Sequence, residues 1–411
     1  MSNDPGHREF DLIVWGASGF TGRLVAEYLR DNYPVGGDLR WAVAGRNPDK
    51  LGQILKGLEF KTELPDVLIA DSNDPESLDR LARKTRVILT TVGPYAKYGS
   101  ELLRACAENG THYCDLAGEA QWIQQMIDRY QLSAEESGAR IVNCCGFDSI
   151  PSDIGVQFLQ NHAVAESGKP CQQVSLVVRA MKGGASGGTF ASMMTALEQA
   201  RSDPQIRRAL GNPYSLNPAG ERSGPDGSDQ SGVEFNELAN VWTAPFVMAA
   251  INTRVVRRTN ALLDYPYGKD FSYRESMATG SGPAGWTRAA VTTAGLGGFV
   301  LAASFDFSRK HLVSRLIPKP GEGPTREQRE NGYFNMQLFG KTDAGDVFRV
   351  RVKGDRDPGY GSTSKMMSEC AVCLAKDDLE VGGGLWTPAS AMGSHLQKRL
   401  SERAGLSFEV E

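Results

Sequence analysis

We predict an α/β fold in which a doubly wound parallel sheet is followed by a second α+β domain on a mixed sheet. Three observations carry this prediction. Apolar runs typical of strands alternate with helical segments up to about residue 160. The first run, 10–15, ends in a glycine-rich turn at 16–22 that opens a helix. After residue 160 the alternation changes to a mixture of strands and helices around a long Pro/Gly/Ser-rich segment at 203–232.

The first turn has the sequence GASGFTG. Its glycines allow a tight turn, a close approach of backbone to a pyrophosphate and close contact between helix and strand. The helix N-terminus adds free N–H groups and a partial positive charge. Because GxxGxxG is less specific than GxGxxG, a glycine-bearing turn in an ordinary α/β protein remains the alternative. We predict a dinucleotide site formed by Gly16, Ala17, Ser18, Gly19, Phe20, Thr21 and Gly22.

The end of the second predicted strand, 39–44, narrows the choice of dinucleotide. An NAD site usually places Asp or Glu there to bind the ribose 2′-hydroxyl. This chain has Gly45 and Arg46 instead. A guanidinium can pair with a 2′-phosphate and stack on the adenine, so the sequence favours NADP(H). The alternative is a solvated surface arginine.

The next two predicted strands, 66–70 and 86–93, end at the same edge of the sheet, where ligands of doubly wound folds bind. We expect the residues after the first to contact the adenine edge and those after the second to pass beneath the ribose and nicotinamide. A helix cap and a plain turn are the structural alternatives. The predicted residues are Asp71, Ser72, Val92, Gly93 and Pro94.

Polar side chains at the ends of later strands are candidates for acid/base chemistry. Two carboxylates four residues apart occur in the run at 112–119, and a second polar group follows the predicted strand at 139–145. A serine in that second group can equally be a helix N-cap. The candidates are Tyr95, Asp115, Glu119, Asp148 and Ser149.

We predict a dinucleotide-binding domain at 8–160, a substrate and dimerisation domain at 161–384, and a C-terminal helix within 385–411 that could return to the first domain. The segment 203–232 is interpreted as a long surface loop or a mobile flap.

Composition bounds the class of protein. The chain has 411 residues, 40% of them hydrophobic, and a net charge of −4, which is typical of a globular protein and gives no reason to expect nucleic acid. Seven cysteines form no disulfide framework, and the polar first residues lack a signal-peptide core, so we expect a cytoplasmic protein. We predict no metal site, and interpret Cys370 and Cys373 as one buried helix face.

Residues 289–305 form a stretch of 17 residues without a charge, with three glycines in its middle. It is slightly short for a membrane-spanning helix and poor in large apolar residues. We interpret it as a buried helix or small-residue packing surface; contact with lipid or a lipid-like substrate is the alternative.

Six motifs together resemble the saccharopine dehydrogenase-like oxidoreductases, in particular the subgroup with the trans-acting enoyl reductases of mycobacterial glycolipid synthesis. They are GASGFTG at 16–22, AGR at 44–46, VGPY at 92–95, HYCDLAGE at 112–119, GFDSIPSD at 146–153 and SGGT at 186–189. The resemblance covers most of the chain and implies an NADP-type Rossmann domain with an α/β second domain. It does not imply saccharopine dehydrogenation.

The leading hypothesis is an NADP(H)-dependent oxidoreductase that reduces an enoyl or other unsaturated group on a lipid-like or carrier-bound substrate, and whose enoyl specificity rests on the resemblance. A non-catalytic NADP(H)-binding scaffold at a lipid surface is the second. The third is an imine or amino-acid reductase, for which Arg179, Arg254, Arg257 and Arg274 could bind carboxylates. We also expect a homodimer and possible peripheral contact with membrane or lipid through 289–305.

Overall fold

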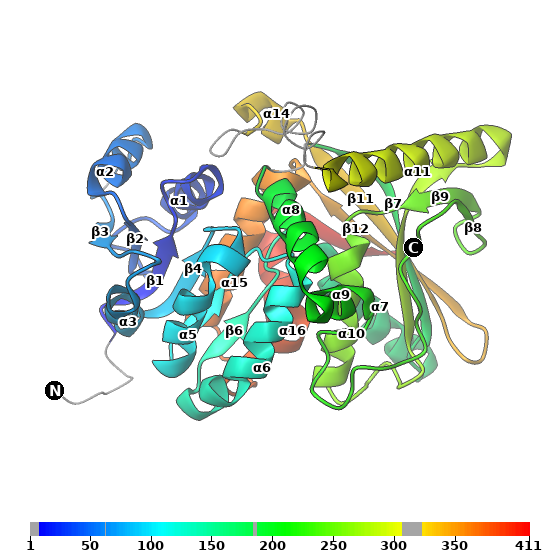
Figure 1. Ribbon diagram of the computed structural model, residues 1–411, viewed down its shortest axis with the longest axis horizontal. Helices are drawn as coiled ribbons and strands as arrows, with labels where there is room; N and C mark the ends of the chain where they lie inside the picture. Colours follow the sequence, from blue (N-terminus) through cyan, green and yellow to red (C-terminus); the bar gives the residue numbers. More distant parts are fainter. Residues whose placement is uncertain (1–7, 62, 184–186, 306–322) are drawn as a thin grey trace. The chain divides into compact units, whose positions relative to one another are not determined.

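The computed structural model describes residues 8–61, 63–183, 187–305 and 323–411. Within them the chain forms two units. Unit 1 comprises the residues up to Phe147 together with Tyr360–Ala404. Unit 2 comprises Asp148–Gly359 and Gly405–Glu411. Figure 1 shows the elements of both.

Unit 1 is built on a parallel sheet with the strand order β13-β6-β5-β4-β1-β2-β3. This order, with β1 between β4 and β2, is that of a Rossmann sheet extended by one strand, and the predicted fold class is confirmed. The strands are β1 Phe10–Trp15, β2 Trp41–Gly45, β3 Asp66–Ile69, β4 Thr85–Thr90, β5 His112–Cys114, β6 Arg140–Val142 and β13 Gly384–Trp386.

Some helices of unit 1 begin at a side-chain cap. Asn47 accepts the amide of Lys50 at the start of α2, and Asp74 accepts that of Ser77 at the start of α3. The helices are α1 Phe20–Asn32, α2 Pro48–Gly57, α3 Pro75–Arg83, α4 Tyr95–Tyr98, α5 Ser100–Glu108, α6 Ala120–Ser137, α15 Thr363–Lys376 and α16 Pro388–Arg403.

The C-terminal part of unit 1 was predicted only for the helix within 385–411, which is α16 Pro388–Arg403 and lies in unit 1. α15 packs against β1, β4 and β5 beside α1, and α16 packs against α15. Strand β13 pairs with β6 through Leu385 and Ile141. Residues 360–384, predicted to belong to the second domain, therefore complete the first sheet and its helical layer.

A buried carboxylate ties α15 to α1. Glu369 is fully buried and accepts hydrogen bonds from the hydroxyls of Tyr28 and Tyr33, each at 2.8 Å. Nη1 of Arg399, from α16, lies 3.3 Å from the same carboxylate. Three donors thus compensate the cost of burying this charge, and they link three helices.

Unit 2 is built on a mixed sheet with the order β14-β12-β11-β7-β10-β9-β8. β7 and β10 are parallel, and the other described pairs are antiparallel. The strands are β7 Gln173–Lys182, β8 Glu234–Asn236, β9 Val241–Pro245, β10 Ser272–Gly280, β11 Tyr333–Lys341, β12 Val347–Gly354 and β14 Leu406–Val410.

Two adjacent helices, α7 and α10, lie on this sheet (Figure 1). α7 packs against β11, β12 and β14, with Phe158 edge-on to Phe408. Because α7 buries its apolar side against the second sheet, the first domain ends near 147 rather than at the predicted 160. The helices of unit 2 are α7 Ile150–Ser167, α8 Gly187–Ser202, α9 Pro204–Gly211, α10 Ala249–Leu262, α11 Gly282–Ser304 and α14 Arg326–Glu330. The SGGT motif at 186–189 lies partly outside the described residues.

The segment 203–232 is held to α10 by arginines. Arg254 donates to the carbonyl of Leu210 at 2.6 Å. Arg257 Nε lies 2.7 Å from a carboxylate oxygen of Asp226. The segment also contains helix α9, so the mobile-flap interpretation does not fit the structure.

We expect Glu369→Ala to lower the free energy of unfolding by roughly 3–5 kcal/mol, because it removes the buried acceptor that the hydroxyls of Tyr28 and Tyr33 and the guanidinium of Arg399 share. Urea unfolding followed by circular dichroism measures this. Glu402→Ala, at an exposed position of α16, is the control and should change stability by less than about 0.5 kcal/mol. Equal stability of the two variants would show that the carboxylate does not hold the helices together.

Candidate functional site

The turn after β1 is shaped by close contacts that require glycine. Gly16 has φ of +93°, and a Cβ there would lie 2.6 Å from Cγ2 of Val92. A Cβ on Gly22 would overlap the carbonyl group of Gly16. Thr91 Oγ1 donates to that carbonyl at 3.3 Å, so the turns after β1 and β4 meet. The predicted strand, glycine turn and helix are confirmed; that they bind a dinucleotide stays a prediction.

The N-terminus of α1 is open to an anion. Its N-cap residue, Gly19, has no side chain to bond the first amides, and the first turn contains no acidic residue. Ser18 and Thr21 are half-buried beside it. β1 and β4 are neighbours in the sheet although two strands separate them in sequence, which makes this a topological switch point, where doubly wound folds bind ligands.

Arg46 follows the last residue of β2 and is exposed. No acidic side chain of the described residues lies within ion-pair distance of it. The guanidinium is therefore available to a ligand at the carboxyl edge of the sheet, as the sequence predicts for a 2′-phosphate.

Asp71 and Ser72 follow β3 and are both half-buried. Oδ1 of Asp71 accepts from the backbone amide of Asn73 at 2.9 Å and from its side-chain amide at 3.2 Å. The cap of α3 is Asp74, so the helix-cap alternative for Asp71 is wrong. Asp71 instead orders the turn at this sheet edge.

Tyr95 and Glu119 fix the start of α4. The carboxylate of Glu119 accepts the amides of Tyr95 at 2.8 Å and Ala96 at 2.9 Å. The Tyr95 hydroxyl donates to the carbonyl of Thr90 at 3.1 Å, and burial raises its pKa well above the ordinary value. These contacts occupy the groups that an acid or base would use, and they position the turn at 92–94.

Asp115 is buried and surrounded by donors. Its carboxylate accepts from Tyr113 Oη at 2.9 Å, Asn143 Nδ2 at 2.7 Å, and the amides of Ala117 at 3.0 Å and Cys144 at 3.1 Å. Burial raises the pKa of Asp115 to about 7, although the donors oppose that rise. The carboxylate joins the ends of β5 and β6, and its lone pairs face the protein.

Asp148 differs from the other candidates. It is the first residue of unit 2, six residues after the end of β6, and is half-buried. Burial raises the pKa of Asp148 to about 6, and the described residues give its carboxylate no hydrogen bond. Its neighbour Ser149 is buried and donates to Asn252 Oδ1 at 3.1 Å, so the serine anchors α7 to α10. Ser149 is also the N-cap residue of α7, as the alternative expects, although its side chain bonds no amide of that helix.

Unit 2 contains a buried polar network that sequence reasoning missed. Asn252 Nδ2 donates to Ser152 Oγ at 3.2 Å and to Glu275 Oε2 at 2.9 Å. The other oxygen of Glu275 accepts from Tyr273 Oη at 2.7 Å. Burial raises the pKa of Glu275 to about 7. The one sequence signal was a glutamate within a strand, and only the packing of α7 and α10 reveals its partners.

Three of the four arginines proposed to bind carboxylates of a substrate bond other groups of unit 2. Arg254 and Arg257 hold the segment 203–232, and Arg179 donates to Gln337 at 2.7 Å. Arg274 alone of the four has an exposed side chain. The structure therefore offers little support for an amino-acid substrate bound by these groups.

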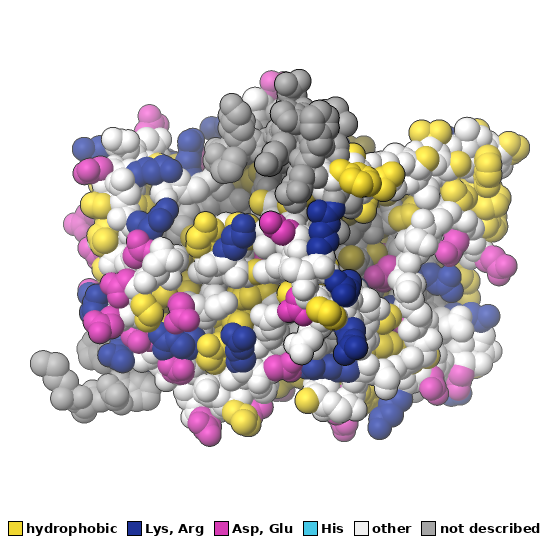
Figure 2. Space-filling model, in the orientation of Figure 1, with side chains coloured by type: hydrophobic (Ala, Val, Ile, Leu, Met, Phe, Trp, Pro, Cys, Tyr) yellow, Lys and Arg dark blue, Asp and Glu magenta, His cyan; other side chains and the backbone are white. Residues whose placement is uncertain are grey.

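The uncharged stretch at 289–305 forms most of α11. The interpretation as a buried helix is wrong, because Val291 is 68% and Leu301 61% exposed. Figure 2 shows hydrophobic side chains along the visible face of this helix. Its glycines Gly295, Gly297 and Gly298 also face open space.

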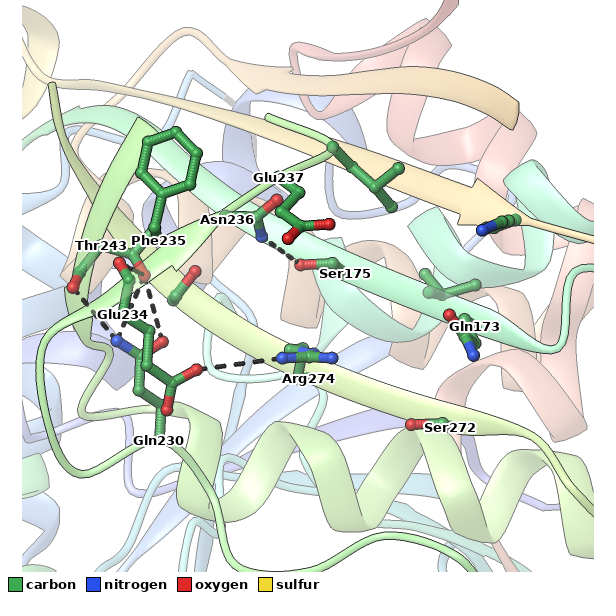
Figure 3. Close-up of a pocket in the computed structure, with 14 residues that line it drawn as sticks. Gln173, Ser175, Gln230, Glu234, Phe235, Asn236, Glu237, Thr243, Ser272 and Arg274 are labelled. Carbon is green, nitrogen blue, oxygen red and sulfur yellow. Dashed lines mark hydrogen bonds and ion pairs between the residues drawn. The ribbon is translucent and has the colours of Figure 1, made fainter. Parts of the chain in front are cut away.

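A polar cavity of about 330 Å³ opens on the mixed sheet of unit 2 beside β8 (Figure 3). Ser276 Oγ lies at its wall, buried and without a hydrogen-bond partner in the described residues. Arg274 crosses it toward Glu234, at 3.9 Å. Charged, amide and hydroxyl groups dominate the wall, which suits a polar ligand better than an acyl chain.

Cys370 and Cys373 lie on the buried face of α15, as predicted. Among the described residues, no group of His, Cys, Asp and Glu side chains has an arrangement that could hold a metal ion.

Comparison with known proteins supports the assignment of the first unit. Residues 12–142 match the saccharopine dehydrogenase NADP-binding domain family. The chain is 42% identical to a putative trans-acting enoyl reductase of Mycobacterium tuberculosis over 98% of both chains. It is 39% identical to a trans-acting enoyl reductase of Mycobacterium ulcerans over 96% of both. The fold is also that of saccharopine dehydrogenase from Saccharomyces cerevisiae, with a TM-score of 0.54 and 12% identity, over 97% of this chain and 99% of that one.

Fold, glycine turn and relatives together define an oxidoreductase with a nicotinamide-dinucleotide domain. The chain belongs to the saccharopine dehydrogenase-like family, in the subgroup of the trans-acting enoyl reductases. In the part of the chain that the structure describes, no helix combines the length and apolar character needed to cross a membrane.

We expect Glu275→Gln to flatten the pH dependence of stability. The pKa of Glu275 is raised from 4.5 to about 7, so between these values the folded protein holds a proton that the unfolded chain has lost. Stability of the unmodified protein should therefore fall as pH rises through this window, with Glu275 contributing on the order of 3 kcal/mol. Thermal unfolding between pH 5 and 8, in steps of about half a unit, measures the slope.

Part of the slope should persist in Glu275→Gln, because the pKa values of Asp115 and Asp148 are also raised by burial. Glu234→Gln, at an exposed position, is the control and should keep the full slope. Identical slopes in all three proteins would contradict a buried, titrating Glu275.

Proposed function

We propose that this oxidoreductase uses NADP(H) to reduce an enoyl or other unsaturated group on a lipid-like or carrier-bound substrate. The observation that carries the proposal is the open turn of β1 and α1 at the switch point, with Arg46 at the end of the next strand and no carboxylate beside it. An NAD site would place an acid at that strand end.

In this proposal the amides at Ala17–Phe20 bind the pyrophosphate and Gly16 and Gly22 allow its close approach. Arg46 binds the 2′-phosphate, Asp71 and Ser72 border the adenine, and the turn at 92–94 supports the ribose and nicotinamide. Glu119 and Tyr95 act as positioning residues for that turn.

The enoyl specificity in this proposal rests on the names of the relatives at 38–42% identity. NADPH supplies a hydride when bound. Reduction of an enoyl thioester would need, besides that hydride at the β-carbon, one proton at the α-carbon. Asp148 suits this task, since its carboxyl has a raised pKa and no competing hydrogen bond in the described residues.

A homodimer, a cytoplasmic location and peripheral lipid contact through 289–305 belong to the same proposal. The amino-acid reductase alternative is weaker, because three of its four arginines bond other groups of unit 2. The scaffold hypothesis predicts NADPH binding without turnover, and an assay with enoyl thioesters distinguishes it from the proposed enzyme.

Arg46→Ala should weaken NADPH binding by about 10–100-fold and leave NADH binding nearly unchanged, because only NADPH carries the 2′-phosphate. Quenching of tryptophan fluorescence by each nucleotide gives the two affinities. Arg80→Ala, an exposed arginine on α3, is the matched control. An equal loss for both nucleotides, or none, would contradict the assignment of Arg46.

Asp148→Asn should lower kcat with NADPH and an enoyl thioester by about 100-fold or more if Asp148 supplies the proton. The unmodified enzyme should lose rate as pH rises through about 6, where the carboxyl ionises, and the variant should lose that dependence. Asp270→Asn, an exposed carboxylate of unit 2, is the control. NADPH binding without oxidation across a panel of acyl thioesters would favour the scaffold hypothesis.

A further inference from the structure

Helix α11 differs from a usual surface helix in which side chains it buries and which it exposes. The residues that it buries are small: Gly285, Ala289 and Ala303. A Cβ at Gly285 would lie 3.3 Å from Cδ1 of Trp242 on β9, so the helix packs closely on the sheet. The large apolar side chains of Trp286, Val291 and Leu301 point outward, whereas such side chains normally face the protein.

The outward residues form one continuous face. Trp286 is 50%, Val291 68% and Leu301 61% exposed. At 100° per residue these three positions fall within an arc of roughly 140°, and they extend over about 22 Å. No charged residue occurs from 289 to 305. A face of this kind marks an interaction site rather than scattered surface residues.

A groove of about 410 Å³ runs between α11 and the end of β10. Met277 and Val291 give it apolar walls, and Arg288 brings a guanidinium to the same lining. The described residues give Arg288 no carboxylate partner; its Nε donates to the carbonyl of Ala284 at 3.2 Å. An apolar groove beside a cation that has no carboxylate partner in the described residues matches an amphiphile with an acyl chain and an anionic head group.

We propose that α11 and this groove, together called the α11 face, dock the protein on an anionic lipid surface. The charges favour lipid over a second copy of the chain, because a copy would offer no carboxylate from 289–305 to pair with Arg288. Trp286, near the start of the helix, is the residue type enriched at the level of lipid head groups. In this proposal α11 lies on the lipid surface and does not cross the bilayer. The inference rests on the proposed function only in that it brings the enzyme to a lipid-like substrate.

Sedimentation of the full-length protein with vesicles tests the α11 face. Phosphatidylglycerol vesicles should bind the protein more strongly than phosphatidylcholine vesicles. Val291→Asp combined with Leu301→Asp should lower binding to both by about tenfold or more, because two apolar side chains no longer enter the lipid. Arg288→Gln should remove the preference for phosphatidylglycerol alone. Leu132→Asp, at a 71% exposed leucine of α6, is the matched control and should bind as the unmodified protein does.

Tryptophan emission supplies an independent readout. Vesicles should shift the emission of the unmodified protein to shorter wavelength, and Trp286→Phe should reduce that shift. NADPH affinity should be the same in all these variants, so loss of vesicle binding is separable from failure of the proposed function. No binding to either vesicle would overturn the inference. So would a change of mass by light scattering in the Val291→Asp, Leu301→Asp variant without a change in vesicle binding, since the face would then join two copies.

Discussion

In the first unit, the turn after β1 and the first turn of α1 lie so close together that no side chain fits between them. A Cβ on Gly22 would meet the carbonyl of Gly16, and the hydroxyl of Thr91 bonds the same carbonyl from the β4 turn. Three segments therefore meet at the switch point of the sheet. The amides of α1 face outward there because Gly19 offers them no side chain.

Around this point the protein uses carboxylates to hold loops in place. Glu119 accepts two backbone amides at the start of α4. Asp115 accepts four hydrogen bonds at the ends of β5 and β6. These carboxylates hold the loops at this edge of the sheet, because their oxygens accept hydrogen bonds from the protein itself. Asp148, the first residue of unit 2, has a carboxylate that the described residues leave without a hydrogen bond, which is why the proposed chemistry concentrates on it.

Much of the fold could be predicted from local patterns. The strands and helices of the first 140 residues follow from hydrophobic periodicity and from caps such as Asp74. The roles of Asp115 and Glu119 could not, since composition places a carboxylate at a strand end but does not say whether distant amides reach it. The same limit hid β13 and α15, whose partners lie more than 200 residues earlier. For α11 the lack of charge was visible in the sequence, but the outward direction of Val291 and Leu301 was not.

A crystal structure of the protein with NADP⁺ tests the central claim most directly. The account predicts the pyrophosphate on the amides of residues 17–20 and the 2′-phosphate within hydrogen-bonding distance of Arg46. A dinucleotide bound elsewhere, or one bound here with Arg46 turned to solvent, would contradict it.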